Sequence, residues 1–580
     1  MGANACDDVF TWADRDPGRA MFAVQADGAW RPVTAVQFAG RVGAVAAGLV
    51  ATGIRPGDRV GLMALASLDW AVCDFAIWAA GAVTVPIYET SSAEQITWQL
   101  SDSGAATVFA GSAQLADAIR GAQPAKAGEI WRLDAGGLDA LTRAGQGAEA
   151  GEVARRRAAV TAETLATIVY TSGTTGRSKG CMISHGNLTG AVCATIAVPG
   201  VREQMLTADA SGLLFLPLSH ILARVVVLCL VHAGKRVGFL PDPNQLPGAL
   251  LTFRPTILLT VPRVLEKVAT AARQQAEAEG HQRMFAAAEA TAQAWSRSGR
   301  RAGVLLRLRH ALFARSVYAR LRRALGGRVA WVISGGAPLN EDLGHFLHGA
   351  GLTVIEGWGM TETAGEVTMN RPAVQRIGSV GLPLPGYSVR VAADGELKVE
   401  GPGIFQGYWQ DPQATRAAFD GRWLRTGDLG RVDDDGFVCI TGRKKEILIT
   451  AGGQHVVPSV LEDKVREHWL IAECVVTGDQ RPYVAALVTL DEAAFARWKQ
   501  RQGKPAGATA SELGGDPDLL GAVQQAVDRA NAAVSRPETI KRYRILPGQF
   551  AVGAELTPTG KVRRDYVLAK YASDIHALYA

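Results

Sequence analysis

A loop rich in glycine, serine and threonine follows a short apolar segment at residues 165–170. Its glycines let backbone amides turn toward an anion without a Cβ atom in the way. Four neighbouring hydroxyl groups add hydrogen-bond donors, and one lysine adds a positive charge. The loop therefore suits the phosphate groups of a nucleotide. Its residues include Thr171, Ser172, Gly173, Thr174, Thr175, Gly176, Lys179 and Gly180.

The spacing in this loop differs from that of the Walker phosphate-binding loop, G-x-x-x-x-G-K-[ST]. Gly176 is followed by Arg177 and Ser178, and only then by Lys179. A kinase or GTPase of the Walker type is therefore disfavoured. The alternative is a flexible surface loop, but such loops seldom follow a buried strand directly and carry a lysine so placed.

The elements that must position this loop follow a simple alternation. Through the first 440 residues, short apolar runs alternate with helical patterns, as in parallel sheets covered by helices on both faces. This predicts an α/β fold with mostly parallel strands. The clearest strand candidates are residues 58–65, 82–88, 105–111, 165–170, 213–218, 256–261 and 329–334, and two clear helices are 35–52 and 91–103.

The chain of 580 residues is too long for one hydrophobic core. From Gly381 the segments become shorter and turn signals more frequent, which predicts a small β-rich subdomain at about 381–442. Fresh alternation of strands and helices after Gly442 predicts a separate α+β domain. We therefore divide the chain into a large domain at 1–442 and a small C-terminal domain at 443–580.

Composition restricts the function classes. A formal net charge of +6 permits an anionic ligand but does not indicate nucleic-acid binding. Seven scattered cysteines without a C-x-x-C pair indicate reduced thiols, and the N-terminus shows no apolar signal-peptide region, so a cytoplasmic protein is expected. The apolar stretch at 212–234 contains proline, histidine and arginine, which favours a buried strand and helix over a membrane span.

A basic segment at 297–328 carries ten arginines and no acidic residue. Apolar residues recur near helical spacing between the arginines, at 304, 308, 312, 317, 321 and 325. One interpretation is a helix that meets anionic lipid at a membrane surface. The other, which base rates for charge runs favour, is a packed helix with a solvated basic face.

The glycine-rich loop resembles the phosphate loop of the adenylate-forming family, which includes acyl-CoA synthetases, luciferases and the adenylation domains of peptide synthetases. Four further segments match that family in the expected order, so the resemblance spans essentially the whole chain. It implies a large nucleotide-binding domain with a mobile C-terminal lid. The segments are T-S-G-T-T-G-R-S-K-G at 171–180, G-W-G-M-T-E at 357–362, T-G-D at 426–428, G-R-K-K-E at 442–446 and P-T-G-K at 558–561.

The resemblance implies a binding role for several residues around the nucleotide. Trp358 stands where relatives commonly have a tyrosine against the adenine, so a contact through a phenolic hydroxyl is lost. Asp428 would accept hydrogen bonds from both ribose hydroxyls, and Arg443 would contact ribose or phosphate. By themselves, Trp358 could be a core residue and Asp428 a turn residue. The implied adenine side also includes Gly335, Gly336, Ala337, Gly359 and Thr361.

The resemblance also implies the catalytic groups. Glu362 would hold Mg²⁺, with the Thr171 hydroxyl nearby, because a hard cation prefers oxygen ligands. Lys561 would bond the carboxylate and the α-phosphate oxygens while these two anions join. Lys445 matches the hinge about which the C-terminal domain would rotate between the two half-reactions. Many relatives have aspartate there, and a basic residue is typical of long-chain acyl-CoA synthetases.

The acyl substrate is indicated by residues 216–224. Amino-acid-activating relatives commonly have an aspartate in this region, and none lies between Asp209 and Asp242. His220 and the apolar Ile221 suit an uncharged acyl chain, although His220 could equally be a core histidine. The helical segment 263–328 and the L-G-G-R at 325–328 also resemble long-chain acyl-CoA synthetases.

These features predict a ligase that joins a long-chain fatty acid to CoA, using ATP and Mg²⁺ and releasing AMP and pyrophosphate. Alternatives within the family are a ligase for medium-chain or aryl acids and an acyl-AMP ligase that loads a carrier protein. A catalytically silent nucleotide-binding regulator is the alternative from another class.

Overall fold

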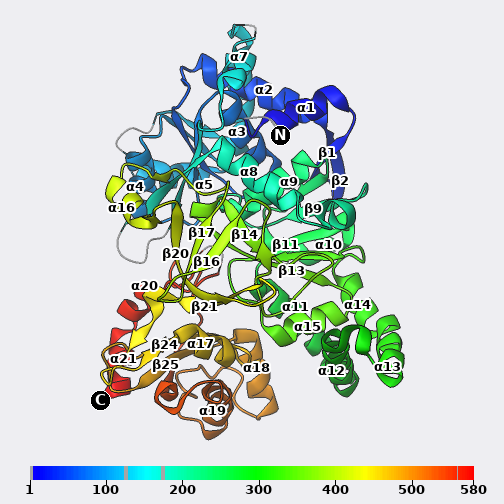
Figure 1. Cartoon of the computed structure of the whole chain (residues 1–580), viewed down its shortest axis with the longest axis vertical. Helices are drawn as coiled ribbons and strands as arrows, with labels where there is room; N and C mark the ends of the chain where they lie inside the picture. The colour runs from blue at the N-terminus through cyan, green and yellow to red at the C-terminus, as the bar shows by residue number, and fades with distance from the viewer. Residues whose placement is uncertain (1–3, 123, 125–127, 150, 172–176, 558–559) are drawn as a thin grey trace. The chain divides into compact units, whose positions relative to one another are not determined.

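A computed structural model of the chain describes residues 4–122, 124, 128–149, 151–171, 177–557 and 560–580. The backbone divides into two compact units, and Figure 1 shows their elements. Unit 1 comprises Met1–Val389, Lys398–Arg425 and Asp434–Val438, and unit 2 comprises Arg390–Leu397, Thr426–Asp433 and Cys439–Ala580. The domain boundary expected after Gly442 falls inside the last segment of unit 2 and stays a prediction.

Unit 1 contains a seven-stranded sheet in the order β18-β8-β7-β4-β3-β5-β6. Strands β7, β4, β3, β5 and β6 pair in parallel, as the apolar runs predicted, whereas β8 and β18 add antiparallel pairs at one edge. The strands are β3 (Arg59–Met63), β4 (Val83–Ile87), β5 (Thr107–Ala110), β6 (Ile130–Arg132), β7 (Leu165–Thr171), β8 (Lys179–Ser184) and β18 (Gly407–Tyr408).

The helices over this sheet begin where polar side chains cap them. Thr34 and Gln37 form a capping box at α2 (Ala35–Ala51), and Ser92 and Gln95 form another at α4 (Ala93–Ser103). Both helices were expected from periodicity, and their observed ends lie within two residues of the expected ones. Every residue of helix α3 (Leu68–Ala79) except Asp69 is buried, because the helix packs against both α2 and strands β3 and β4.

A nine-stranded sheet in unit 1 has the order β15-β14-β13-β12-β11-β9-β10-β1-β2. Its centre, from β13 to β1, is parallel, and antiparallel strands close both edges. The strands are β1 (Ala20–Ala26), β2 (Ala29–Thr34), β9 (Ser211–Leu214), β10 (Arg236–Phe239), β11 (Ile257–Thr260), β12 (Trp331–Ser334), β13 (Thr353–Met360), β14 (Gly365–Met369) and β15 (Leu382–Pro383).

Helices α8 (His185–Ile196) and α9 (Ile221–His232) lie between these two sheets, since α8 contacts both β8 and β14 (Figure 1). The apolar stretch at 212–234 is thus a strand and a buried helix, as expected. The buried Arg224 of α9 donates two hydrogen bonds to Asp74 of α3, at 2.7 and 3.1 Å. Burial raises the pKa of Asp74, and the Arg224 guanidinium opposes that shift. No helix in the described part of the chain is long and apolar enough to span a bilayer.

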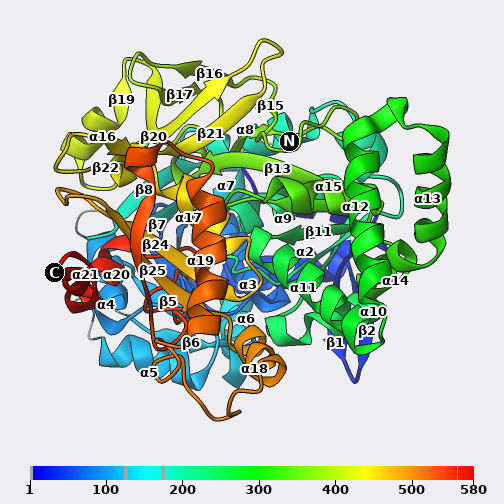
Figure 2. The same ribbon diagram turned by 90° about the horizontal axis from the view of Figure 1, so that it is seen from below.

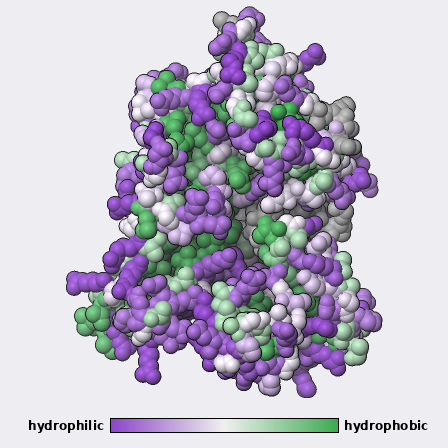
Figure 3. Space-filling view, turned by 180° about the vertical axis from the view of Figure 1, so that it is seen from behind, coloured by the Kyte–Doolittle hydropathy of each residue, from purple (hydrophilic) through white to green (hydrophobic). Residues whose placement is uncertain are grey.

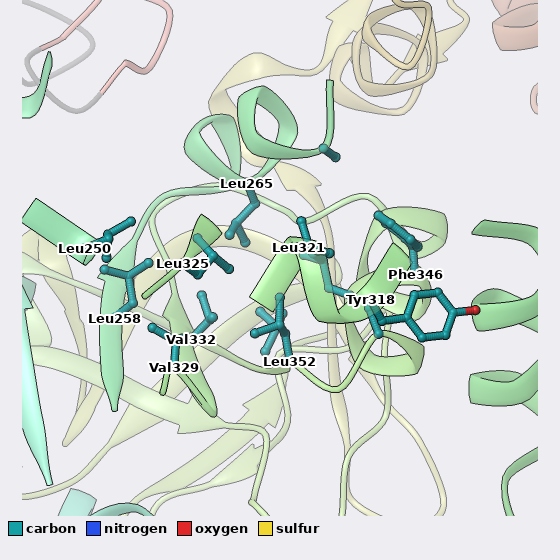
Figure 4. Close-up of a cluster of buried hydrophobic side chains, with 14 of the residues drawn as sticks. Leu250, Leu258, Leu265, Tyr318, Leu321, Leu325, Val329, Val332, Phe346 and Leu352 are labelled. Carbon is teal, nitrogen blue, oxygen red and sulfur yellow. The ribbon is translucent and has the colours of Figure 1, made fainter. Parts of the chain in front are cut away.

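Residues 263–328 are helical, as predicted, and help to form an apolar core beside the nine-stranded sheet (Figure 4). Tyr318, Leu321 and Leu325 pack there with strand residues such as Leu258 and Val332. The helices of this segment are α11 (Pro262–Ala278), α12 (Gln282–Ser298), α13 (Val304–Arg315) and α14 (Val317–Ala324). Helices α10 (Leu246–Phe253) and α15 (Glu341–Gly349) flank it in the sequence.

The basic segment forms two helices, because Ser316 leaves helical geometry between α13 and α14 (φ −111°, ψ −88°). The packed-helix interpretation holds for α14, whose Val317 and Leu321 are buried. In α13 the expected apolar face does not pack, because Val304, Leu308 and Leu312 are exposed, and the helix packs through Phe313 and Ala314 instead. Such an interruption of the helix shifts the apolar stripe around the helix axis. The spacing of apolar residues in the sequence does not reveal this shift.

The β-rich region holds a five-stranded sheet of order β16-β17-β20-β19, with β21 paired to β20. Strands β17 and β20 both run from one unit into the other along the chain. The elements are β16 (Ser388–Val391), β17 (Glu396–Glu400), α16 (Pro412–Ala418), β19 (Phe419–Asp420), β20 (Trp423–Val432) and β21 (Val438–Arg443).

The C-terminal part of unit 2 is α+β, as predicted. Alternate residues of its three-stranded sheet enter separate cores on the two faces, Val476 and Val488 on one and Val475 and Leu487 on the other. Its elements are α17 (Pro458–Arg466), β24 (Ile471–Thr477), β25 (Val484–Leu490), α18 (Glu492–Arg501), α19 (Pro517–Asn531), β26 (Ile540–Ile545), α20 (Arg564–Lys570) and α21 (Ala572–Tyr579). Figure 2 shows α17 and α19 lying along this sheet.

Candidate active site

The two ends of the predicted phosphate loop lie opposite each other in unit 1. Thr171 ends β7 and pairs in register with Lys179, the first residue of β8. The ring nitrogen of Trp98 in α4 donates a 2.8 Å hydrogen bond to the Ser178 carbonyl and so fixes the start of β8. The loop residues between these strands, Ser172, Gly173, Thr174, Thr175 and Gly176, lie outside the described residues.

Glu362 lies close to these strand ends. It is buried in a short 3₁₀ turn, Thr361–Thr363, which follows β13 and contacts β8. The Tyr408 hydroxyl donates a 2.8 Å hydrogen bond to its Oε1, and Lys179 Nζ lies 5.2 Å from the centre of the Tyr408 ring. A carboxylate, a lysine and a threonine thus gather in unit 1 at the carboxyl end of β7.

Cys181 completes this cluster. Burial raises the pKa of its thiol well above the usual value, and the charge of Glu362 adds to the rise, while a hydrogen bond with Thr171 opposes it. The thiol is therefore protonated at neutral pH and acts as a packing group between Thr171 and Glu362, since only a thiolate is a strong nucleophile.

Sequence reasoning missed both Tyr408 and Cys181. Side chains alternate along a strand, so Lys179 predicts that Cys181 faces the same side two residues later. Tyr408 carried no local signal, because β18 reaches β8 only through a tertiary pairing that sets Tyr408 opposite Cys181.

The predicted adenine side begins where β12 ends at Ser334. The Ser334 hydroxyl is buried and has no hydrogen-bond partner among the described residues, so a ligand could supply one. Gly335 and Ala337 follow it, and Gly336 between them has φ +87°, which favours glycine. The loop is held from β13, where Glu356 Oε1 accepts a 3.3 Å hydrogen bond from the Leu339 N–H. Burial raises the pKa of Glu356 to about 7.

The segment G-W-G-M-T-E lies on β13 and its 3₁₀ turn. A Cβ atom on Gly359 would lie only 1.9 Å from the Gly365 carbonyl, so the close approach of β14 requires glycine there. The Trp358 ring is largely buried in unit 1, and Thr361 opens the 3₁₀ turn. Both the adenine-stacking and the core interpretations of Trp358 fit this burial.

The predicted acyl residues begin helix α9. His220 Nδ1 accepts a 3.3 Å hydrogen bond from the Leu222 N–H and so caps the helix, while Ile221 is buried. Leu222 touches the adenine-side loop, since a Cβ atom on Gly335 would lie 3.0 Å from its side chain. The apolar first turn of α9 therefore lies beside the strand end at Ser334, and its role in an acyl pocket stays a prediction.

Unit 2 brings together the predicted ribose and catalytic residues. Asp428 is buried in β20, and Arg443 Nε at the end of β21 lies 3.1 Å from its Oδ1. Burial and the charge of Arg443 lower the pKa of Lys561 to about 8, and Asp428 and Glu446 oppose this shift. Two cations, Arg443 and Lys561, thus interact within unit 2 with two acids, Asp428 and Glu446.

Lys561 is held by its backbone. Its N–H donates a 3.0 Å hydrogen bond to Thr557 Oγ1, and its carbonyl accepts a 2.7 Å bond from the Thr557 N–H. Lys445, the predicted hinge, lies in the 3₁₀ turn Lys444–Glu446 directly after β21. Its neighbour Lys444 is anchored to Asp394 at 2.5 Å. Pro558 and Thr559 of the P-T-G-K segment lie outside the described residues.

The donor atoms near Glu362 fit magnesium bound together with a nucleotide. In the described part of the chain, no group of three or more histidines, cysteines or acids could hold a metal by itself. Mg²⁺ is commonly held by one or two carboxylates together with substrate phosphates and water. A single carboxylate, Glu362, beside the Thr171 hydroxyl matches that pattern.

Comparison with known proteins identifies the family. A family model described as AMP-binding enzyme matches residues 9–409, and the model of its C-terminal domain matches residues 445–580. The chain belongs to the AMP-binding enzyme family. The resemblance stated from the sequence motifs is thereby confirmed.

Among members of this family, the long-chain-fatty-acid–CoA ligase FadD15 of Mycobacterium bovis is 47% identical to this chain, over 98% of this chain and 96% of that protein. The protein of the same name from Mycobacterium tuberculosis is 46% identical over the same shares. The structure of ATP-bound MatB from Rhodopseudomonas palustris is 26% identical, with a TM-score of 0.71 over 99% of this chain and 100% of that chain. The predicted fold class is confirmed.

Proposed function

We propose that this AMP-binding enzyme is a long-chain-fatty-acid–CoA ligase. It forms an acyl-adenylate and pyrophosphate from a fatty acid and ATP, and then acyl-CoA and AMP. The observation that carries the proposal is the near full-length identity of 47% with a ligase of that name. The absence of an acid from residues 210–241 supports an uncharged acyl group, and the medium-chain, aryl and carrier-protein alternatives have no comparable support.

In the first half-reaction, a carboxylate oxygen of the fatty acid attacks the α-phosphorus of ATP, and pyrophosphate leaves. Lys179 and the hydroxyl of Thr171 bind the phosphate chain, and the Lys561 ammonium offsets the charge where the two anions meet. Glu362 and Thr171 would hold Mg²⁺, which would supply further charge neutralisation at the phosphate oxygens. Tyr408 positions the Glu362 carboxylate through its hydrogen bond.

The nucleoside is bound by groups from several strands. Asp428 accepts hydrogen bonds from the ribose hydroxyls and Arg443 orients that carboxylate, consistent with their 3.1 Å contact. Trp358 and the loop after Ser334 bind the adenine. In the second half-reaction the CoA sulfur attacks the acyl carbonyl carbon, a C–S bond forms, and the bond from that carbon to the phosphate oxygen breaks to release AMP.

The test is an assay of AMP release across saturated acids of graded length, with and without CoA. The proposal predicts AMP release that requires CoA and rises toward long chains. Preference for an aryl or medium-chain acid would contradict the substrate assignment. AMP release without any acid-dependent ATP–pyrophosphate exchange would contradict the formation of an acyl-adenylate.

Tyr408→Phe removes the donor that holds Glu362. A hydrogen bond to a charged group is worth about 1.5–3 kcal/mol, so we expect acyl-adenylate formation at limiting Mg²⁺ to fall roughly tenfold to a hundredfold. The rate should recover partly as the Mg²⁺ concentration rises. Tyr318→Phe is the matched control, because its hydroxyl also donates a buried 2.7 Å hydrogen bond, to the Ala288 carbonyl of α12. An equal loss in both variants, without Mg²⁺ rescue, would assign Tyr408 a purely structural role.

A further inference from the structure

Helix α13 presents an apolar stripe to solvent. Its members are exposed to 75% at Val304, 66% at Leu305, 64% at Leu308 and 68% at Leu312. At 3.6 residues per turn these four positions share one face of the helix. Seen from behind, a hydrophobic patch edged by hydrophilic residues lies at the lower left, the side on which α13 lies (Figure 3).

The opposite face fixes α13 to unit 1. The His310 ring stacks on Trp295 of α12 at a centroid distance of 4.3 Å, and its Nε2 lies 2.7 Å from the Gly349 carbonyl. Phe313 and Ala314 pack against the apolar core. Because α13 is already packed through this opposite face, its exposed leucines face the solvent. Figure 2 shows α13 at the outer edge of the helical layer.

Positive charge surrounds the stripe. By helical geometry, Arg307 and Arg309 flank it on its two sides and Arg315 continues it at the C-terminal end. In the described part of the chain, neither Arg309 nor Arg315 forms a salt bridge, and all three arginines are exposed. Other arginines of the segment are paired, such as Arg297 with Asp342 and Arg320 with Glu279.

We propose that α13 docks the enzyme on an anionic lipid bilayer. Its valine and leucines would enter the boundary between headgroups and acyl chains, and the arginines would reach lipid phosphates while their stems cover apolar surface. Each arginine near an anionic surface and each buried leucine adds attraction, so a short helix needs both contributions.

Two other occupants fit the surface less well. A second copy of the chain would bring like-charged arginines together, because the segment 297–328 contains no acid to face them. Nucleic acid would contact the arginines but would give the four exposed apolar side chains no apolar partner. Charge and apolar surface together favour a lipid bilayer.

Vesicle flotation with the full chain tests the proposal, using phosphatidylcholine vesicles with and without phosphatidylglycerol. We expect binding that requires phosphatidylglycerol and weakens as salt screens the arginines. Leu308→Ser/Leu312→Ser should lower the bound fraction at least about tenfold. Arg309→Gln/Arg315→Gln should lower binding to anionic vesicles by about tenfold or more.

The control variant is Val36→Ser, which removes another exposed apolar residue (51%) on α2, far from α13 in Figure 1. It should bind vesicles as the wild type does. No vesicle binding, or equal binding by all variants, would overturn the proposal. So would self-association that disappears in Leu308→Ser/Leu312→Ser without any vesicle binding. Because no substrate is present, the result is independent of the ligase activity proposed above.

Discussion

Lys561→Ala should slow acyl-adenylate formation by about 10²–10³-fold while leaving transfer from supplied acyl-adenylate to CoA largely intact. The physical reason is that two anions meet only in the first half-reaction, where a positioned cation lowers the barrier. Single-turnover measurements of each half-reaction separate the two effects. Lys464→Ala is the matched control, since Lys464 is an exposed lysine of the same unit, paired with Glu467 at 2.9 Å.

The pH dependence gives a second readout of Lys561. Because its pKa is lowered to about 8, the ammonium loses its proton at a lower pH than an ordinary lysine does. Adenylation requires the charged form, so kcat/KM for ATP should fall as pH rises through about 8. This inflection should be absent in Lys561→Ala. Equal loss of both half-reactions in that variant, or an unchanged pH profile, would remove Lys561 from the adenylation step.

Lys445→Pro should retain acyl-adenylate formation and lose thioester formation by at least about tenfold. We propose that the C-terminal part of the chain rotates about Lys445 between half-reactions, because Lys561 and the CoA thiol need the same face of the acyl group. Proline fixes φ near −65° and removes an N–H, so it would hold one conformation. Rapid-quench measurement of acyl-AMP and acyl-CoA in one turnover reports both steps.

Lys445→Ala is the control for this variant, since it removes the same side chain and keeps a flexible backbone. It should carry out both half-reactions at nearly wild-type rates. If Lys445→Pro also does so, the hinge lies elsewhere or no rotation is needed. If both variants lose thioester formation equally, the lysine side chain matters rather than the backbone.

Several parallel strands of the fold were predictable because each has a local signal. The apolar runs at 82–88 and 256–261 became β4 and β11, and the capped helix after Thr34 began at the expected residue. Antiparallel additions such as β18 were not predictable, because two residues of strand depend on a neighbour far away in sequence. The exposure of Leu308 was missed because the break at Ser316 shifts the apolar stripe of α13 relative to that of α14.

The candidate site was predicted through motifs, and its supporting contacts were not. Lys179 came from the composition of its glycine-rich loop, and Glu362 came from a segment that resembles a motif of the family. The contact of Arg443 with Asp428 joins two such segments within unit 2. Tyr408 holds Glu362, and Glu356 holds the loop at Leu339. Neither contact could be predicted, because each depends on how the strands pair in space. The five loop residues 172–176 lie outside the described structure, so their phosphate contacts stay predictions.

The central claim is that the fatty-acid carboxylate attacks the α-phosphorus of ATP before the acyl group passes to CoA. It is tested most directly with a fatty acid labelled with ¹⁸O in its carboxylate. The attacking oxygen stays on phosphorus when the CoA sulfur attacks the carbonyl carbon and the bond from that carbon to the oxygen breaks. Mass spectrometry should therefore find one labelled oxygen in the AMP produced. Label in inorganic phosphate, with ADP as the nucleotide product, would contradict the account.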